Sequence, residues 1–472
     1  MGKKIISFSK KVKQFFKNNR MDIFISIIIF ISLIVTRFIR LGDTAFFVND
    51  QGRDIKVLYN MLINGKMTLI GPATSFSGQF GNIYFGSYYY YFLLPFYLIS
   101  QSAYFMTGVF PALFVLGFIM FFLVKEFNFG QKSIIGLLLV FSWFSLYYTR
   151  FLWNLNLAFL LSFILFSVFL VLKKRIVKNG LLSLIFGLIS GMVFQVHYGM
   201  LFLYMSLLTF FFDNRKNLLL YISGIIISFF PFLLFDIRHQ YVISKNILSY
   251  LSSFLKFNGT GASINSLISI FANMFEYYLL PLVSVNYWIK VFSALLIYLS
   301  IIILHLRKKK EVNTFIAISF IIFFLSFFIF KRDFDYYLAC FMIWFYIGLG
   351  LALYDLTKNT LGRYLVAGLM IIFIGLNYFK YFTLPINSFG LAKQYFITEI
   401  IKKDLSKNNT KELSISVLPH NDDVNSLEYL VTLDDLNINS NAKNKYLVCY
   451  GKCIGLKKVL YSDRSISVYT DR

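Results

Sequence analysis

Residues 155–172 read LNLAFLLSFILFSVFLVL, a run of 18 positions without a charge, and residues 173–178 read KKRIVK. An apolar run of about 18–20 residues is long enough to cross the ~30 Å hydrocarbon layer of a bilayer as a helix. In lipid, such a run can satisfy its backbone hydrogen bonds only by forming a helix. The stretch therefore predicts a membrane-spanning helix followed by a basic connector.

The rest of the chain repeats this pattern. Of its 472 residues, 58% are hydrophobic and 14% are charged, whereas a typical soluble domain has about 25% charged residues. The mean hydropathy is +0.68. We therefore expect an all-α polytopic membrane protein with about 11 transmembrane helices, near residues 22–41, 103–124, 133–148, 155–172, 180–197, 199–212, 218–235, 288–306, 313–330, 336–354 and 363–380.

Basic residues exceed acidic ones, and the formal net charge is +24. In a soluble protein this charge would favour nucleic-acid binding. Here Lys and Arg are what the cytoplasmic loops of a membrane protein require, and no soluble domain of a known nucleic-acid-binding type carries them. We expect membrane lipids, and no nucleic acid, among the partners.

The predicted topology depends on whether the segment Ser87–Ser100, SYYYYFLLPFYLIS, crosses the membrane. The segment is short and contains Pro95, so its pattern alone does not decide this. If it does not cross, the dense basic runs KKRIVK and RKKK (307–310) lie inside, as the positive-inside rule requires. If it crosses, both runs lie outside. We therefore predict an interfacial or re-entrant helix here, with its tyrosines at the level of the lipid head groups.

The same argument places the two termini. Residues 1–21 are basic and precede an apolar run without a small-residue cleavage site, which is typical of an uncleaved signal anchor with a cytoplasmic N-terminus. We expect a multi-pass protein of the plasma (inner) membrane. Its transmembrane module covers 22–380, its first outer loop covers about 42–102 and holds interfacial helices, and residues 381–472 form a small extracytoplasmic α/β domain.

The C-terminal segment has the pattern of a small folded domain. LSISVL and KYLVCY read as strands, and NSLEYLVTL between them reads as a helix. Cys449 and Cys453 lie there in CYGKC. A disulfide between them is compatible with the sequence if the domain lies outside the cytoplasm. Cys340, in an apolar run, reads as a small core residue.

A charged motif follows the first predicted spanning helix. DQGRD contains Asp50, Arg53 and Asp54, and on a helix the two carboxylates, four positions apart, share a face. A carboxylate beside the membrane can act as a general base or a metal ligand, and an Arg can clamp a phosphate. The alternative is a solvated helix start with an ordinary ion pair.

Further polar residues lie at other predicted outer ends. They belong to TRFLWNLN, QVHYG, FDIRHQY, KRDFDYY and the Tyr-rich segment, and they are Arg150, His197, Asp236, Arg238, His239, Lys331, Arg332, Asp333, Asp335, Tyr88 and Tyr89. Each alone is compatible with a snorkelling side chain, a structural His or a solvated loop. Because all of these residues are predicted to lie on the outer side of the membrane, they favour a site on the outer face.

The sequence lacks the usual nucleotide and metal motifs. G-x-G-x-x-G, Walker A, H-E-x-x-H and metal-finger spacings are absent. An ATP-driven pump or a sugar-nucleotide enzyme is therefore disfavoured. An enzyme on the outer face has no ATP or nucleotide sugar to use, so it would need an activated donor that the membrane carries.

In chain order, DQGRD, GP, YYYYFLLP, RFLWN, QVHYG and FDIRH resemble motifs of bacterial glycosyltransferases of the GT-C superfamily. The resemblance covers about residues 20–380. Within that superfamily, the chain resembles glycosyltransferase family 39. This group is similar to dolichyl-phosphate-mannose–protein mannosyltransferases and lipid A aminoarabinose transferase. It implies a hexosyl- or pentosyltransferase of the cell envelope. Such an enzyme moves a sugar, with inversion, from a polyprenyl-phosphate donor to a lipid, glycan or protein acceptor.

The resemblance also implies roles for residues. Asp50 would be the first-loop carboxylate that deprotonates or orients the acceptor hydroxyl, and Asp54 is a second catalytic candidate. The implied clamp for the donor phosphate consists of Arg53, Arg150 and Arg238. The implied substrate-binding residues are His197, Asp236, His239, Tyr88 and Tyr89.

Some alternatives stay open. Protein mannosyltransferases usually carry Asp-Glu at the first-loop site, whereas Asp50 is followed by Gln51, which disfavours a protein acceptor. No cofactor is required, and the use of a divalent cation stays open. Other functions are a transporter or flippase of a lipid-linked sugar, a surface-polysaccharide polymerase or ligase, and a non-catalytic scaffold. The nearly uncharged middle of the helices favours the enzyme over the transporter.

Overall fold

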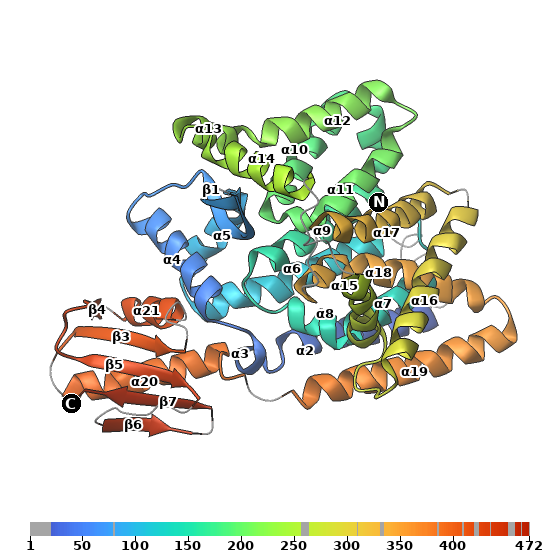
Figure 1. Ribbon diagram of the computed structural model, residues 1–472. Coiled ribbons are helices and arrows are strands. Elements are labelled where there is room, and N and C mark those ends of the chain that lie inside the picture. The colour runs from blue at the N-terminus through green and yellow to red at the C-terminus, as the bar shows by residue number, and fades with distance from the viewer. Residues whose placement is uncertain are drawn as a thin grey trace, which may run out of the picture.

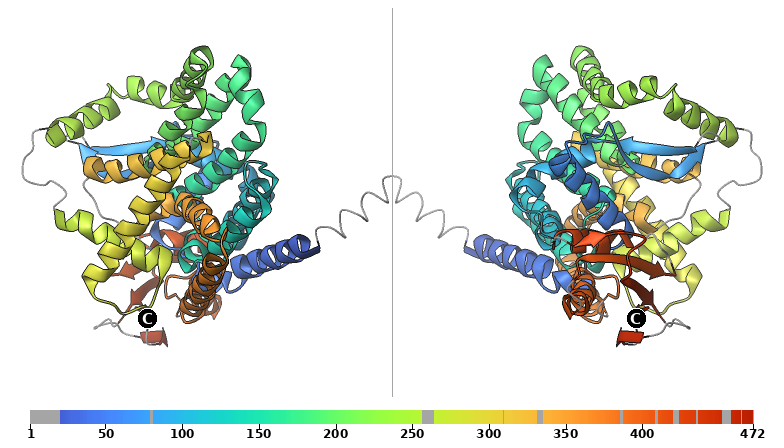
Figure 2. Two further views of the ribbon diagram at one scale, coloured as in Figure 1. Left: turned by 90° about the vertical axis from the view of Figure 1, so that its right-hand side faces the viewer. Right: turned by 90° about the vertical axis from the view of Figure 1, so that its left-hand side faces the viewer.

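The computed structural model describes residues 20–78, 81–255, 264–308, 310–330, 335–384, 387–407, 410–419, 424–434, 436–451, 458–463 and 465–471. Most of the molecule is a bundle of helices, and a small sheet domain lies at one end of it (Figure 1). Helix α2 runs out from one side of this body (Figure 2). Residues 331–334 of the KRDFDYY motif lie outside the described part.

Each predicted spanning segment contains a helix. The bundle consists of α2 (Arg20–Phe38), α6 (Ala103–Leu123), α7 (Phe129–Phe141), α8 (Trp143–Tyr148), α9 (Asn154–Lys178), α10 (Gly180–Val196), η1 (Tyr198–Met200), α11 (Leu201–Leu207), η2 (Leu208–Phe211), α12 (Arg215–Ser228), α13 (Phe230–Arg238), α14 (Val242–Leu255), α15 (Ile264–Met274), η3 (Phe275–Leu279), α16 (Tyr287–Arg307), α17 (Glu311–Phe330), α18 (Asp335–Leu356) and α19 (Thr360–Phe382).

Within the described residues, five helices are long and apolar enough to cross a membrane, or six if the bent pair α12–α13 forms one span. The five are α6, α9, α16, α18 and α19, and several shorter apolar helices accompany them. The chain is therefore a multi-pass membrane protein. The predicted number of 11 spans stays a prediction.

Two predicted spans are interrupted, and the sequence shows why. Between α7 and α8, the Ser142 hydroxyl accepts a hydrogen bond from the Ser145 amide at 3.2 Å, which starts a new helix. Helices α12 and α13 meet at 41°, and Pro231 lies in the first turn of α13. Proline tolerates that position but interrupts a continuous helix.

Helices α10 and α12 approach closely because small residues line their contact. A Cβ atom on Gly187 would lie 2.0 Å from the Tyr221 carbonyl oxygen, and one on Gly224 would lie 2.2 Å from the Leu184 carbonyl oxygen. Gly187 and Gly191 are four positions apart, so they share a face of α10. This is the small-xxx-small packing of membrane helices.

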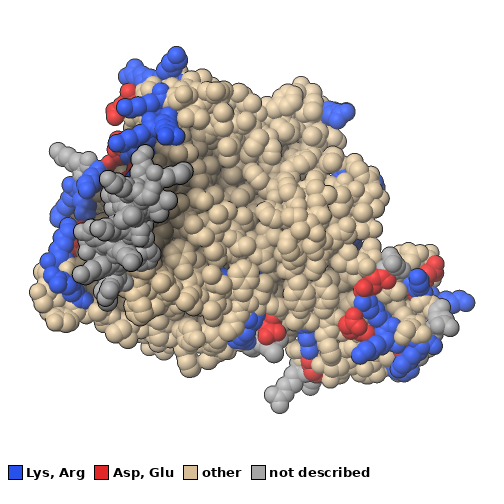
Figure 3. Space-filling model, turned by 180° about the vertical axis from the view of Figure 1, so that it is seen from behind, with Lys and Arg blue, Asp and Glu red and all other residues tan. Residues whose placement is uncertain are grey.

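Ion pairs join the connectors that were predicted to lie inside. Lys173, near the end of α9, has its Nζ 2.7 Å from the Glu311 carboxylate and 3.9 Å from that of Glu126. Lys308, after α16, donates to Asp355 near the end of α18. These connectors therefore share one end of the bundle, as the charge argument requires. Figure 3 shows Lys and Arg gathered along one edge and a broad uncharged surface between that edge and the small domain.

The predicted first outer loop contains helices and a pair of strands. It contains α3 (Leu41–Thr44), α4 (Asn49–Ile63), the hairpin of β1 (Ile70–Gly78) and β2 (Gly81–Gly86), and α5 (Tyr88–Ile99). The two strands are antiparallel, with Ala73 opposite Tyr84. The segment Ser87–Ser100 is helical as predicted, and its interfacial position stays a prediction.

The C-terminal segment forms the predicted small α/β domain. Its elements are α20 (Leu391–Lys407), β3 (Glu412–Leu418), α21 (Val424–Thr432), β4 (Asn437–Ile438), β5 (Lys445–Tyr450), β6 (Lys458–Ser462) and β7 (Ile466–Thr470). The strand order is β4-β3-β5-β7-β6. The predicted strands LSISVL and KYLVCY are β3 and β5, which pair in parallel, and NSLEYLVTL forms α21. Cys449 is disulfide-bonded, and Cys453 lies outside the described residues.

The close packing of α10 on α12 gives a first prediction. We expect Gly187→Ala to lower the free energy of unfolding by about 1–3 kcal/mol, as overpacking typically does, because the added methyl group meets backbone rather than a flexible side chain. Gly368→Ala on α19 is the control, since its Cβ atom would meet no atom within 4 Å. Thermal unfolding in detergent measures both, and equal melting temperatures would contradict the packing.

Candidate active site

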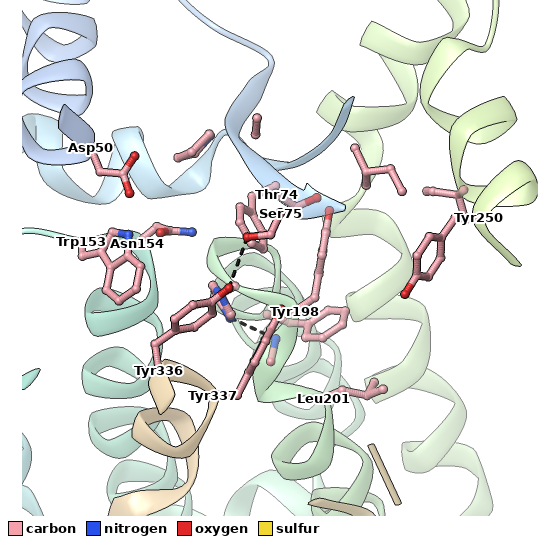
Figure 4. Close-up of a pocket in the computed structure, with 18 of the residues that line it drawn as sticks. Asp50, Thr74, Ser75, Trp153, Asn154, Tyr198, Leu201, Tyr250, Tyr336 and Tyr337 are labelled. Atoms are coloured by element: carbon pink, nitrogen blue, oxygen red, sulfur yellow. Dashed lines mark hydrogen bonds between the residues drawn. The ribbon is translucent and has the colours of Figure 1, made fainter. Parts of the chain in front are cut away.

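A cavity of about 490 Å³ lies where several predicted outer segments meet. Its wall comes from α4, the β1–β2 hairpin, the start of α9, the turn after α10, and parts of α14 and α18. The Ser75 and Tyr336 hydroxyls, 3.3 Å apart, connect the hairpin to α18 across it (Figure 4). The segments DQGRD, RFLWN, QVHYG and KRDFDYY, far apart in the sequence, therefore share one site.

The two ends of the cavity differ in polarity. Asp50, Trp153 and Asn154 lie together on one side, while Leu201 and Tyr250 lie on the opposite side (Figure 4). A cavity that is charged at one end and apolar at the other suits a ligand with a polar head and a hydrocarbon tail.

Arg53 connects the two carboxylates of α4. Its Nη1 lies 2.8 Å from Asp50 Oδ1, and its Nη2 lies 2.8 Å from Asp54 Oδ1. The Asp50 side chain is 40% exposed and that of Asp54 is 0% exposed. Asp50 and Arg53 line the cavity, so they can meet a substrate directly, whereas Asp54 supports them from behind.

Asp54 is a carboxyl group buried beneath the site. The Tyr90 hydroxyl and the Arg53 Nε donate hydrogen bonds to its Oδ1, at 3.1 and 2.9 Å, and its Oδ2 has no hydrogen-bond partner among the described residues. Burial raises the pKa of Asp54 to about 6, although the neighbouring Arg53 cation opposes this rise. The Asp54 carboxyl is therefore harder to ionise than an ordinary aspartate.

Gln51, the residue after Asp50, has a local structural role. Its Oε1 accepts a hydrogen bond from the Val48 amide at 3.1 Å, and the side chain is buried. It thereby closes the first turn of α4, where backbone amides lack partners within the helix. An uncharged amide is sufficient for this contact, so the sequence departure from Asp-Glu leaves the start of α4 intact.

His197 lies in the wall of the cavity, as the prediction of a substrate-binding role requires. Its Nδ1 accepts a hydrogen bond from the Gly199 amide at 3.1 Å, and its ring stacks on Phe85 with 4.8 Å between centroids. A nitrogen that accepts from an amide carries no proton, so the ring is neutral and Nε2 holds the proton. His197 can therefore donate a hydrogen bond but not supply a positive charge.

A second cavity, of about 290 Å³, lies on the other side of Asp50. Asp50, Trp153 and Tyr336 line both cavities, and the second is walled largely by aromatic residues such as Phe46 and Tyr147. The ring centroids of Trp153 and Tyr336 are 5.5 Å apart. Asp50 thus stands where the two cavities meet.

Arg150, a predicted phosphate ligand, is not among the residues that line the two cavities. It is 2% exposed, donates from Nη2 to the Ile39 carbonyl oxygen, and lies with its guanidinium 5.2 Å from the centre of the Tyr381 ring. These contacts tie the segment between α8 and α9 to the residue after α2 and to α19. A role in phosphate binding stays a prediction.

The FDIRHQY residues also lie apart from the lining. Asp236 is buried and accepts hydrogen bonds from the Ile243 amide at 2.7 Å and the Ser244 hydroxyl at 2.5 Å, so it caps the start of α14. Arg238 is exposed. His239, also exposed, stacks on Phe235 at 3.9 Å between centroids. Capping explains Asp236 without a substrate.

Tyr88 and Tyr89, predicted to bind substrate, are absent from the lining of both cavities. The Tyr88 hydroxyl donates to the Ser228 carbonyl oxygen at 2.9 Å, which joins α5 to α12. Tyr89 is fully buried. The next residue, Tyr90, instead supports the site through Asp54.

Several lining residues were not predicted. They are uncharged polar or aromatic side chains, and Figure 4 labels Thr74, Ser75, Asn154, Tyr198, Tyr250 and Tyr337 among them. In a chain with 20% aromatic residues, a single Tyr does not stand out as a candidate site residue. Tyr336 and Tyr337 do follow the charged residues of KRDFDYY, of which only Asp335 belongs to the described part.

The structure gives no direct support for a protein-held metal ion. Among the described residues, no group of three or more His, Cys, Asp and Glu side chains is close enough to hold one. Asp50 and Asp54 are instead joined by Arg53, whose cation occupies the space between them.

The buried Asp54 predicts a pH effect on stability. Its pKa of about 6 in the fold exceeds the ordinary value of 3.8, so between these values the folded protein binds the proton more tightly than the unfolded chain. The free energy of unfolding should therefore fall as the pH rises from about 4 to 6, and this contribution should be constant above 6. The melting temperature of wild type minus that of Asp54→Asn, measured from pH 4 to 7.5, tests this. A difference independent of pH would contradict the shifted pKa.

No protein-family model matches the sequence, and no curated protein does. Solved structures do match it. ArnT from Cupriavidus metallidurans bound to undecaprenyl phosphate has a TM-score of 0.60 at 10% identity, over 94% of this chain and 98% of that one. ArnT in the apo state has a TM-score of 0.58 at 12% identity, over 94% of this chain and 98% of that one. The Archaeoglobus fulgidus oligosaccharyltransferase has a TM-score of 0.53 at 13% identity, over 90% of this chain and 69% of that one. Both proteins are members of the GT-C superfamily, so this chain has the GT-C fold that the motif resemblance predicted.

Proposed function

We propose that this protein is a membrane glycosyltransferase that moves a sugar from a polyprenyl-phosphate donor to an acceptor on the outer face of the plasma (inner) membrane. The observation that carries the proposal is the position of Asp50, which lines both cavities. A transfer reaction needs two substrates at one reactive group, and two cavities that meet at a carboxylate provide for both. That ArnT was solved with undecaprenyl phosphate supports this class of donor.

The donor fits the larger cavity. Its apolar side, with Leu201, Ile247 and Tyr250, suits the first prenyl units of the lipid. Arg53, on the charged side, is the cation among its described lining residues, and a guanidinium binds phosphate oxygens through two parallel N–H groups. The smaller cavity, with its aromatic wall, is then left for the acceptor.

The residues then divide the chemistry between them. As the acceptor hydroxyl attacks the anomeric carbon, Asp50 takes its proton. The new C–O bond forms while the bond between the anomeric carbon and the phosphate oxygen breaks, and the lipid phosphate leaves with that electron pair. Arg53 stabilises the charge on the departing phosphate. Attack from the face opposite the phosphate gives inversion.

The structure favours the enzyme over a transporter. A transporter of this kind often has broken helices in both halves, with polar groups near the middle of the membrane. In the described part, one pair of consecutive helices that could cross the membrane together is bent, α12–α13. The polar residues of the site instead come from the outer loop and from helix ends.

The role of Asp50 can be tested with a conservative change. We expect Asp50→Asn to fold normally and to lower transfer by about 10²–10⁴-fold, the usual contribution of a general base. The assay follows radiolabel from polyprenyl-phosphate sugars into an envelope acceptor. Asp213→Asn is a matched control, because Asp213 lies outside both cavities. Near-normal transfer by Asp50→Asn would remove Asp50 from the mechanism.

The assignment of the phosphate ligand gives a separate prediction. Arg53→Ala should weaken binding of undecaprenyl phosphate by at least about tenfold, since a hydrogen bond to a charged group contributes about 1.5–3 kcal/mol. Arg238→Ala should leave binding unchanged, because Arg238 is exposed and outside the lining. Native mass spectrometry in detergent measures both affinities. Equal affinities of Arg53→Ala and wild type, or a loss in Arg238→Ala, would contradict the assignment.

A further inference from the structure

Helix α4 touches the C-terminal domain at a glycine. A Cβ atom on Gly52 would lie 2.2 Å from the Ser426 amide nitrogen and 2.5 Å from the Asn425 carbonyl carbon. Both of these atoms belong to the backbone at the start of α21. Any side chain larger than hydrogen would therefore have to push the two helices apart.

Polar contacts flank this glycine on the same face of α4. The Asn425 Nδ2 donates to Asn49 Oδ1 at 3.1 Å. The Lys56 Nζ lies 2.5 Å from Glu428 Oε2 and donates to Asn425 Oδ1 at 3.3 Å. Positions 49, 52 and 56 are three and four apart, so they form one stripe along the helix. Both helices therefore match each other in shape and in polar groups.

Helix α21 is also anchored to α5. The hydroxyls of Tyr97 and Tyr429 are 3.0 Å apart, and the Tyr429 hydroxyl donates to the Gln101 carbonyl oxygen at 2.5 Å. Both tyrosines are buried. Helix α5 in turn carries Tyr90, which bonds Asp54. The domain thus holds α4 directly and also through the helix behind it.

We infer that the C-terminal domain is a positioning element of the active site: the docking of α21 on α4 sets where Asp50 and Arg53 stand at the cavity. The inference rests on the proposed function. The stripe at 49, 52 and 56 faces α21, and the neighbouring positions 50 and 53 face the site, on the same short helix. A shift of α4 at its contact with α21 therefore also moves Asp50 and Arg53.

The size of the effect follows from the geometry. An ordinary contact of a Cβ atom is 3.4–4 Å, so Gly52→Ala must move α4 or α21 by about 1 Å or more. A misplacement of about 1 Å in a reacting group can lower the rate about 100-fold. Gly52, Lys56 and Asn425 line neither of these two cavities, and they act through the residues that do.

The test compares Gly52→Ala with Gly108→Ala, whose Cβ atom would meet no atom within 4 Å. Amide hydrogen exchange, followed by mass spectrometry without substrate, reports on segments 49–63 and 424–432. Steady-state transfer kinetics report on kcat and KM. We expect faster exchange in both segments and a fall in kcat of about 100-fold for Gly52→Ala, and neither change for Gly108→Ala.

A charge exchange gives a second measurement that does not depend on the glycine. Lys56→Glu should speed exchange in segment 49–63 and lower kcat by up to about fivefold, the range of a half-exposed ion pair. Adding Glu428→Lys should recover most of both losses. Lys402→Glu is the matched control, because Lys402 pairs with Asp434 inside the domain.

The outcomes separate the two proposals. Unchanged exchange in Gly52→Ala would overturn the docking, and faster exchange with normal kcat would overturn the positioning role. No recovery in the charge-exchanged double variant would also count against it. Faster exchange in Gly52→Ala together with no transfer by wild type would support the docking and overturn the proposed function.

Discussion

Arg53 stands between two carboxylates, 2.8 Å from each, at the edge of a largely apolar protein. Burying a charge such as that of Asp54 costs several kcal/mol unless good partners are present, and here Arg53 and Tyr90 supply them. This requirement fixes the rotation of α4 about its axis. With Asp54 facing inward and Arg53 reaching both carboxylates, Asp50 is held at the junction of the two cavities.

The remaining architecture serves this junction. The bundle provides an apolar wall at one side of the larger cavity, the β1–β2 hairpin covers it, and α18 contributes Tyr336 between the two spaces. The C-terminal domain contacts α4 through Gly52, on the stripe beside the one that carries Asp50 and Arg53. A site on a loop segment is held less precisely than one on the helices or strands of a scaffold. Contacts on several sides of α4 compensate for this.

The sequence predicted the parts that the bilayer dictates. The long apolar runs form helices. The basic connectors share one end of the bundle, where Lys173 contacts Glu311. DQGRD and His197 were found because charged or titratable groups stand out in an apolar chain. Asp236 stands out equally but caps α14, and local capping leaves the same signal as function. Trp153 and Gly52 lie in RFLWN and DQGRD, but the sequence predicted no role for either residue, since their contacts depend on segments that meet only in three dimensions.

The most direct test is a cryo-electron microscopy map of the protein with an antibody fragment and undecaprenyl phosphate. The account predicts phosphate density within about 3 Å of the Arg53 guanidinium, the length of a charge-assisted hydrogen bond. The prenyl chain should run along the wall that contains Leu201 and Tyr250. Phosphate density elsewhere, for example at the exposed Arg238, with an empty larger cavity, would contradict the central claim that α4 presents Asp50 and Arg53 to a lipid-phosphate donor.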